Sequence, residues 1–177
     1  MGGLYIREGL ELLPLKEGGT GSNSASVLQP SILPDRYESG TPNTPGIAGL
    51  AAGLKFIMST GLAKIYEHEI SLANHLQDGL TKIPGVNIYG PPSGTIKAPV
   101  ISFNIQGLEA SEVAIILDQS FNIACRAGLH CAPEACQSLD LLRGGTVRLS
   151  PGYFNTHEEI TTCLDAISEI ANEYKSL

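Results

Sequence analysis

The sequence predicts an α/β protein in which a small sheet carries helices on one face and is preceded by an extended arm. From residue 86 onward, short apolar runs typical of strands alternate with longer stretches of helical spacing, in the order strand, strand, helix, strand, strand, helix. Residues 14–44 instead are rich in Gly, Ser, Thr and Pro and show no periodicity. We therefore expect a strand and extended arm over residues 1–45 and a small α/β domain over residues 46–177.

The N-terminal elements follow from local signals. Residues 1–7 are typical of a strand, and residues 14–44 form the arm, which we expect to pack on another surface because it has no apolar pattern of its own. Thr44 is a candidate N-cap with Pro45 at the first helical position. The helix that follows has an apolar face at Ile47, Leu50, Ala51, Leu54, Ile57 and Met58. A second helix over about 61–81 should bury Leu62, Ile65, Tyr66, Ala73, Leu76 and Leu80.

The remaining elements alternate as the fold class requires. Strands are predicted at 86–89, 99–105, 121–126 and 146–150, with a helix near 109–119 between the second and third. A loop of about twenty residues separates the last two strands. The final helix opens at Thr156, which forms a capping box with Glu159.

Composition excludes several classes of protein. The chain has 177 residues, 42% of them apolar, and a net charge of −7 without a run of Lys or Arg, which argues against a nucleic-acid or anionic-membrane partner. It contains no apolar stretch of about 18 residues and no signal-peptide pattern. Four cysteines at uneven spacing are typical of reduced thiols, so we expect a cytoplasmic protein.

The sharpest chemical signal is the segment Arg126–Pro133, which holds Arg126, His130 and Cys131 within six residues. A thiol at the head of a loop with cationic neighbours favours the nucleophilic thiolate. Cys125 and Cys163 lie on apolar faces and are expected to be inert. An incidental loop cysteine remains the alternative. A zinc site from Cys125, His130, Cys131 and Cys136 is disfavoured, because the spacing does not match usual ligand pairs.

Two further segments are candidates for binding. Arg148 lies in a strand between apolar neighbours and needs an anion, either in a structural salt bridge or in the carboxylate of a substrate. The arm segments 18–24 and 36–43 expose backbone amides and small hydroxyl residues that can cradle a phosphate. Neither segment matches a P-loop or a dinucleotide fingerprint, and ordinary turns are the alternative.

Taken in order, these segments resemble the class V aminotransferase superfamily, in its cysteine desulfurase and selenocysteine lyase branch. The resemblance implies the small C-terminal domain of a fold-type I pyridoxal-phosphate enzyme, preceded by an arm of the large domain. Each motif is weak alone, but their common order is specific. The motifs are Gly2–Tyr5, Glu17–Thr20, Glu38–Asn43, Arg126–Cys131, Arg148 and Tyr153–Thr156.

The resemblance implies a role for each candidate residue. Cys131 would attack the sulfur of a cysteine held on the cofactor, leaving L-alanine and a persulfide. Arg148, Arg126 and His130 would bind the substrate. Cofactor contacts would come from Gly19, Thr20, Thr41 and Asn43, with Thr41 reaching the cofactor phosphate of the other subunit of a homodimer. A sulfur-acceptor protein is an expected partner.

The sequence also departs from this pattern. The family's cofactor lysine lies in a Ser/Thr-x-His-Lys segment, and none of Lys16, Lys55, Lys64, Lys82, Lys97 or Lys175 has that context. We therefore expect a C-terminal portion that is inactive alone. The alternatives are a selenocysteine lyase or another C–S lyase, and a free-standing sulfur-carrier or metal-binding domain. The choice of cysteine or selenocysteine and the sulfur acceptor are not determined by the sequence.

Overall fold

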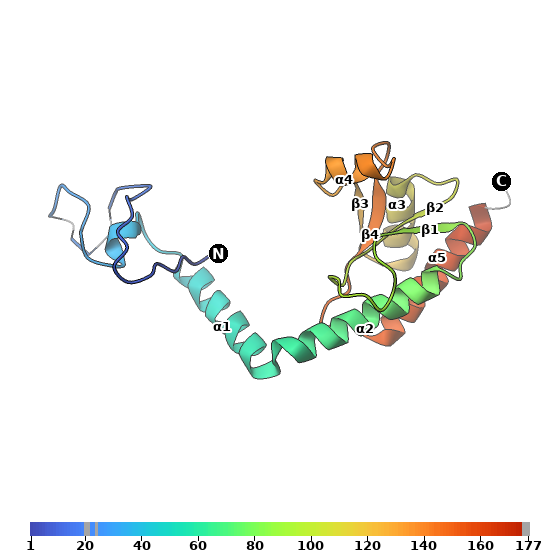
Figure 1. The fold of residues 1–177 in the computed structure, drawn as a ribbon, viewed down its shortest axis with the longest axis horizontal. Helices are drawn as coiled ribbons and strands as arrows, with labels where there is room; N and C mark the ends of the chain where they lie inside the picture. The colour runs from blue at the N-terminus through green and yellow to red at the C-terminus, as the bar shows by residue number, and fades with distance from the viewer. Residues whose placement is uncertain (20–21, 24, 175–177) are drawn as a thin grey trace. The chain divides into compact units, whose positions relative to one another are not determined.

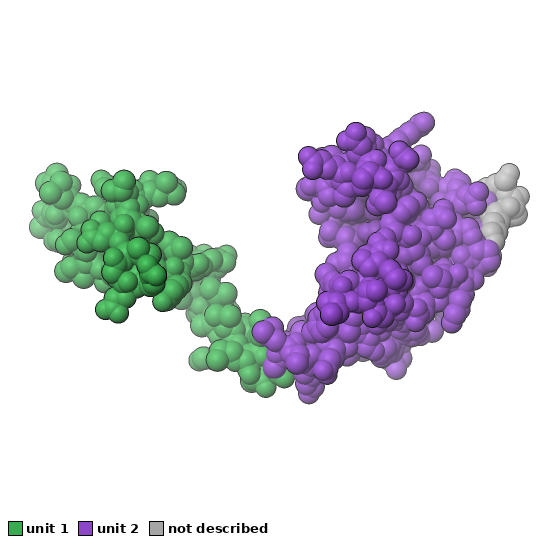
Figure 2. All heavy atoms as spheres, viewed as in Figure 1, with its two compact units in different colours: residues 1–60 green, residues 61–177 purple. Residues whose placement is uncertain are grey.

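The computed structural model describes residues 1–19, 22–23 and 25–174. The chain divides into two compact units, Met1–Thr60 and Gly61–Leu177 (Figure 2). Among the described residues, no single helix is long and apolar enough to cross a membrane, although helices α1 (Thr44–Thr60) and α2 (Leu62–Leu80) pass that criterion together as a bent pair.

The first unit contains a short 3-10 helix, η1 (Asp35–Tyr37), and helix α1 (Thr44–Thr60). No described residue of this unit is buried. The strand predicted at residues 1–7 is absent, because a strand needs a hydrogen-bonded neighbour and the described part of this unit supplies none. The apolar face of α1 is likewise exposed, with Met58 82% accessible.

Polar contacts organise the arm. The Gln29 side-chain amide donates to the carbonyl oxygens of Asp35, at 2.8 Å, and of Glu38, at 3.3 Å. The Tyr37 hydroxyl donates to the Leu12 carbonyl at 3.1 Å. At the start of α1, the amide of Gly46 donates to Asn43 Oδ1 at 3.0 Å. The capping side chain is therefore Asn43, one residue before the predicted Thr44.

The second unit contains the predicted sheet and helices (Figure 1). Its elements are α2 (Leu62–Leu80), β1 (Val86–Tyr89), β2 (Ile101–Ile105), α3 (Ala110–Phe121), β3 (Arg126–Gly128), α4 (Pro133–Ser138), β4 (Thr146–Leu149) and α5 (His157–Tyr174). Two details differ from the prediction. The third strand begins at Arg126 rather than 121, since α3 continues to Phe121 and ends at Asn122 with a left-handed φ of 56°. Helix α4 occupies part of the predicted loop.

All strand pairs are antiparallel, in the order β1-β2-β4-β3. One face of the sheet forms the core with α2, α3 and α5, through residues such as Phe103 and Val147, both fully buried. Only the C-terminal half of α2 joins this core. Leu62 and Tyr66, expected to be buried, are 73% and 40% exposed.

The opposite face of the sheet is polar. The register places Tyr89 opposite Ser102, Ser102 opposite Arg148, and Arg148 opposite Arg126, so these four residues form one row across the four strands. Side chains of directly opposed residues lie on the same face. This row brings together two of the predicted site residues that are 22 positions apart in the sequence.

Candidate functional site

Cys131 is exposed on the loop that follows β3. Its backbone has a φ of 58° and that of His130 a φ of 56°, so two consecutive side-chain-bearing residues are left-handed. Arg126, on β3, donates from Nη2 to Cys131 Sγ at 3.4 Å. The contact places a charged N–H donor beside an accessible sulfur nucleophile. The structure thus brings together two of the residues that the sequence singled out.

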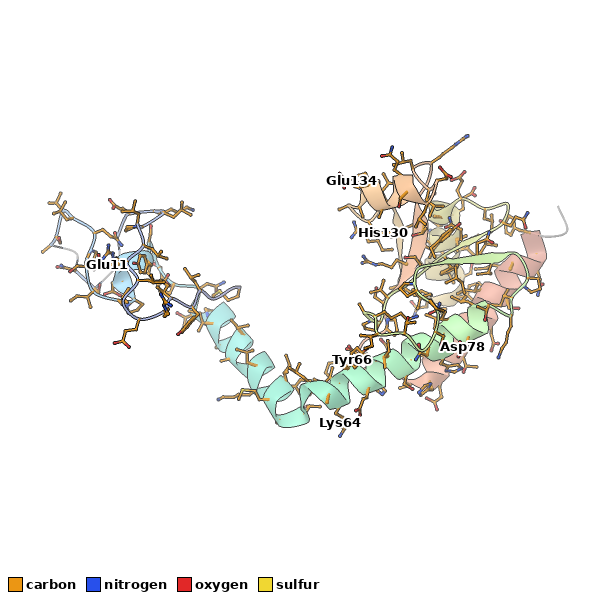
Figure 3. All side chains as sticks on the ribbon, in the orientation of Figure 1. Glu11, Lys64, Tyr66, Asp78, His130 and Glu134 are labelled. Atoms are coloured by element: carbon orange, nitrogen blue, oxygen red, sulfur yellow. The ribbon has the colours of Figure 1, made fainter. Side chains whose placement is uncertain are left out.

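His130, labelled in Figure 3, contacts strand β4, and its Nδ1 is buried. Its Nε2 lies 2.9 Å from the Thr146 carbonyl oxygen and 3.0 Å from Thr146 Oγ1. Burial lowers the pKa of His130 below 6.5, and the charges of Arg148 and Arg126 lower it further, against a raising effect of the Thr146 bond. The imidazole is therefore neutral at neutral pH.

Arg148 and Arg126 are directly opposed across β4 and β3. Like charges directly opposite each other in a sheet destabilise it. Among the described residues, Arg36 forms an ion pair with Glu11 at 3.7 Å, and no carboxylate forms one with Arg126 or Arg148. Arg148 Nε is buried and has no hydrogen-bond partner in the part of the chain that the structure describes. The pair thus presents an unsatisfied donor and two positive charges, which suits an anion such as a carboxylate.

Two more buried polar atoms lack partners in the described part of the chain, and both belong to the same face of the sheet. They are Asn104 Oδ1 and His130 Nδ1. Asn104 lies two residues after Ser102 on β2 and donates from Nδ2 to the Gly145 carbonyl at 3.0 Å. Sequence reasoning missed Asn104, although its place on the polar side of the alternating strand was a usable signal. Unsatisfied buried groups that cluster on one face are typical of a binding site.

The other cysteines are poor nucleophiles. Burial raises the pKa of Cys163 to about 12, with a smaller contribution from Cys125. Burial also raises the pKa of Cys125, and Asp118 adds to the effect. Cys136 is buried in α4, and its thiol donates to the Leu129 carbonyl at 3.6 Å. Within the described ranges, no three His, Cys, Asp or Glu side chains converge in a way that could hold a metal ion.

A cavity of about 360 Å³ lies between the end of α3 and the start of α5. Its lining includes Phe121, Leu149, Asn155, Glu159 and Cys163. None of the predicted site residues that the structure describes lines it. We place the candidate site at Cys131 and the two arginines, because the reactive groups and the unsatisfied donor lie there.

The predicted cofactor contacts belong to the first unit. Gly19 accepts a hydrogen bond from the Gly40 amide at 2.9 Å, and Thr41 is exposed. Asn43 uses its side-chain oxygen to cap α1. Thr20 lies outside the described residues. The role of these four residues in binding a phosphate stays a prediction.

Pyridoxal phosphate, implied by the resemblance, was tested against the residues present. The unsatisfied Arg148 Nε fits the carboxylate of an amino-acid substrate. For the cofactor itself, no hydrogen bond links any described lysine to Cys131, Arg126, His130 or Arg148, and Lys97 bonds instead to Gln77 and to the Pro91 carbonyl. The surface around Arg148 is therefore suited to a carboxylate, and no described lysine is hydrogen-bonded to it.

Known proteins similar to this chain include cysteine desulfurases. A probable cysteine desulfurase of Methanothermobacter thermautotrophicus is 36% identical over 166 residues, which cover 91% of this chain and 40% of that protein. A cysteine desulfurase of Salmonella agona is 34% identical over 175 residues, or 96% of this chain and 42% of the relative. The chain thus spans about two fifths of the length of these relatives.

Solved structures show the same likeness. An apo cysteine desulfurase from Thermococcus onnurineus matches with a TM-score of 0.72 and 39% identity, over 79% of this chain and 34% of that chain. The cysteine desulfurase CsdA from Escherichia coli matches with a TM-score of 0.76 and 27% identity, over 91% and 39% of the two chains. The family model for class-V aminotransferases matches residues 1–162. The chain therefore belongs to the class-V aminotransferase family.

Proposed function

We propose that this chain is part of a pyridoxal-phosphate-dependent cysteine desulfurase. In that enzyme it binds L-cysteine and receives the sulfur atom of L-cysteine on Cys131. The observation that carries the proposal is the contact of Cys131 Sγ with the Arg126 guanidinium, next to the unsatisfied Nε of Arg148. An accessible nucleophile and a free carboxylate-binding group within one small surface are what the reaction requires. The named relatives support the same reaction.

The roles of the residues follow from their chemistry. Arg148 binds the carboxylate of L-cysteine, and Arg126 holds the sulfur atom of Cys131 in place through its hydrogen bond to Sγ. The thiolate forms the new S–S bond as the carbon–sulfur bond of the substrate breaks. The sulfur atom stays on Cys131 as a persulfide, and the remaining carbon takes up a proton to give L-alanine, so atoms and charge balance.

We further propose that the first unit completes a cofactor site in a cytoplasmic homodimer. Pyridoxal phosphate stabilises the carbanion that carbon–sulfur cleavage generates. Gly19, Thr20, Thr41 and Asn43 would contact its phosphate. The absence of any buried residue in the described part of Met1–Thr60 supports an arm that is stabilised by another surface. Four free cysteines are compatible with a reducing compartment.

The experiment uses the protein in its native assembly, with any chain that copurifies with it. With pyridoxal phosphate and L-cysteine present, we expect stoichiometric L-alanine and persulfide. Cys131→Ala should abolish persulfide formation, and Arg148→Met should raise KM for L-cysteine. Cys125→Ala and Cys163→Ala are controls that keep activity, since burial raises the pKa of both thiols.

Other outcomes identify the rival functions. Faster turnover of L-selenocysteine than of L-cysteine would assign a selenocysteine lyase. Persulfide that forms on Cys131 from an external persulfide donor, but never from L-cysteine, would assign a sulfur carrier. Alanine formation that survives in Cys131→Ala would contradict the proposed role of this cysteine.

A further inference from the structure

We propose that His130 is a positioning residue, whose imidazole fastens the loop bearing Cys131 to strand β4 through the Thr146 carbonyl. The inference deepens the proposed function and rests on it, because the placement of Cys131 matters only if that thiol reacts. It differs from the substrate-binding role that the sequence suggested, since the ring atom used in the contact is already engaged by the protein.

The contact is well placed for such a role. His130 Nε2 reaches the Thr146 carbonyl at 2.9 Å across 16 positions of sequence. Thr146 is itself buried, 4% accessible, at the start of a strand that pairs with both β2 and β3. The residue adjacent to the nucleophile is therefore anchored to an interior strand of the sheet. Cys131 itself has a side-chain contact to Arg126 at 3.4 Å and is otherwise exposed.

The hydrogen-bond geometry fixes the tautomer of the ring. A carbonyl oxygen only accepts, so the hydrogen must be on Nε2. Nδ1 then carries a lone pair, and it is buried without a partner. Protonating Nδ1 would bury a second N–H without an acceptor, in a region where Arg126 and Arg148 already contribute positive charge. The imidazole is thus a fixed neutral donor and is not arranged to carry protons.

The backbone explains why the loop needs fastening. His130 and Cys131 both have positive φ, at 56° and 58°, which residues with a Cβ rarely adopt. The His130 bond holds this conformation, and the conformation directs Cys131 Sγ towards Arg126. Without the bond, the two residues would relax to negative φ and the thiol would leave the guanidinium.

The first test needs no variant. Long-range proton–nitrogen NMR correlations of the imidazole in the 177-residue chain report the tautomer. We expect His130 to carry its hydrogen on Nε2 and to remain neutral at pH 7. A ring that carries its hydrogen on Nδ1 would overturn the proposal, because Nε2 could then not donate to Thr146.

The second test separates the tether from the imidazole itself. In His130→Gln the side-chain amide nitrogen reaches the position of Nε2. In His130→Asn the side chain is too short to place its amide nitrogen there. The rate of Cys131 alkylation by iodoacetamide at pH 7.5 should be unchanged in His130→Gln and about fivefold lower in His130→Asn, since a charge-assisted contact with Arg126 is lost. Arg126→Gln should lower the alkylation rate of Cys131 by the same factor. The double variant Arg126→Gln with His130→Asn should be no slower than either single variant.

The outcomes are decisive in both directions. Equal slowing in His130→Gln and His130→Asn would show that the imidazole matters and the tether does not. Wild-type alkylation in His130→Asn would also overturn the proposal. Both readouts are independent of desulfurase turnover, so their failure and the failure of the proposed function are distinguishable.

Discussion

Replacing Gly145 by alanine tests how tightly the reactive loop is packed against the sheet. Gly145 is buried immediately before β4 and has a φ of +70°. A Cβ built on it would lie 2.1 Å from the Gly128 carbonyl oxygen and 2.8 Å from the Leu129 amide nitrogen. These are backbone atoms at the end of β3, where the loop to Cys131 begins, so no side-chain rotation relieves the overlap.

The expected cost has two parts. Placing a side chain at positive φ costs about 1–2 kcal/mol, and forcing extra volume between fixed backbone segments costs about 1–3 kcal/mol more. Gly144 is the matched control, because it has a φ of +88° but its Cβ would meet only the carboxylate end of the flexible Glu109 side chain, at 2.6 Å. Gly144→Ala should therefore lose only the stability that a side chain at positive φ costs, without the packing cost.

Urea unfolding of the chain, followed by circular dichroism, gives the free energy of unfolding of each variant. Gly145→Ala should lie about 1–3 kcal/mol below Gly144→Ala. Because the overlap moves the start of the loop, Cys131 alkylation should also change in Gly145→Ala and not in Gly144→Ala. Equal stability of the two variants would refute the packing argument.

Two further predictions concern charge and protonation. Arg148→Met should raise the free energy of unfolding by about 1 kcal/mol, because it removes a buried unpartnered Nε and the repulsion by Arg126; a clear loss in urea unfolding would mean that Arg148 has a stabilising partner. Cys163 has its pKa raised from 9.0 to about 12, so above pH 9 the unfolded chain releases this proton while the folded chain retains it. Stability should therefore fall as the pH rises from about 9 to about 12, and it should fall less steeply in Cys163→Ala. Identical pH profiles of the unmodified chain and Cys163→Ala would contradict the burial of the Cys163 thiol.

Much of the second unit could be predicted from local sequence. β1 matches its predicted bounds, and the capping box before α5 is confirmed by the Glu159 amide bond to Thr156 Oγ1, at 3.2 Å, and its reciprocal at 2.9 Å. These features depend on residues within a few positions of one another. The burial of only half of α2 was not predictable, since periodicity identifies an apolar face but not how far its neighbours extend.

The site was predictable residue by residue but not as an arrangement. Loop position and neighbouring charge identified Cys131 and Arg126, and a place in a strand between apolar neighbours identified Arg148. The pairing that sets Arg126 opposite Arg148, and the bond from His130 to Thr146, depend on the register of β3 with β4, which contacts distant in sequence determine. Asn104 was missed although the alternation of its strand was a local signal.

The most direct test of the central claim is to locate the sulfur. The native assembly is incubated with L-cysteine and pyridoxal phosphate, the thiols and persulfides are trapped by alkylation, and each cysteine-containing peptide is analysed by mass spectrometry. We predict one additional sulfur atom on the Cys131 peptide and none on those of Cys125, Cys136 and Cys163, which are wholly or partly buried. Turnover that leaves Cys131 unmodified and places the persulfide on another of these cysteines would contradict the account.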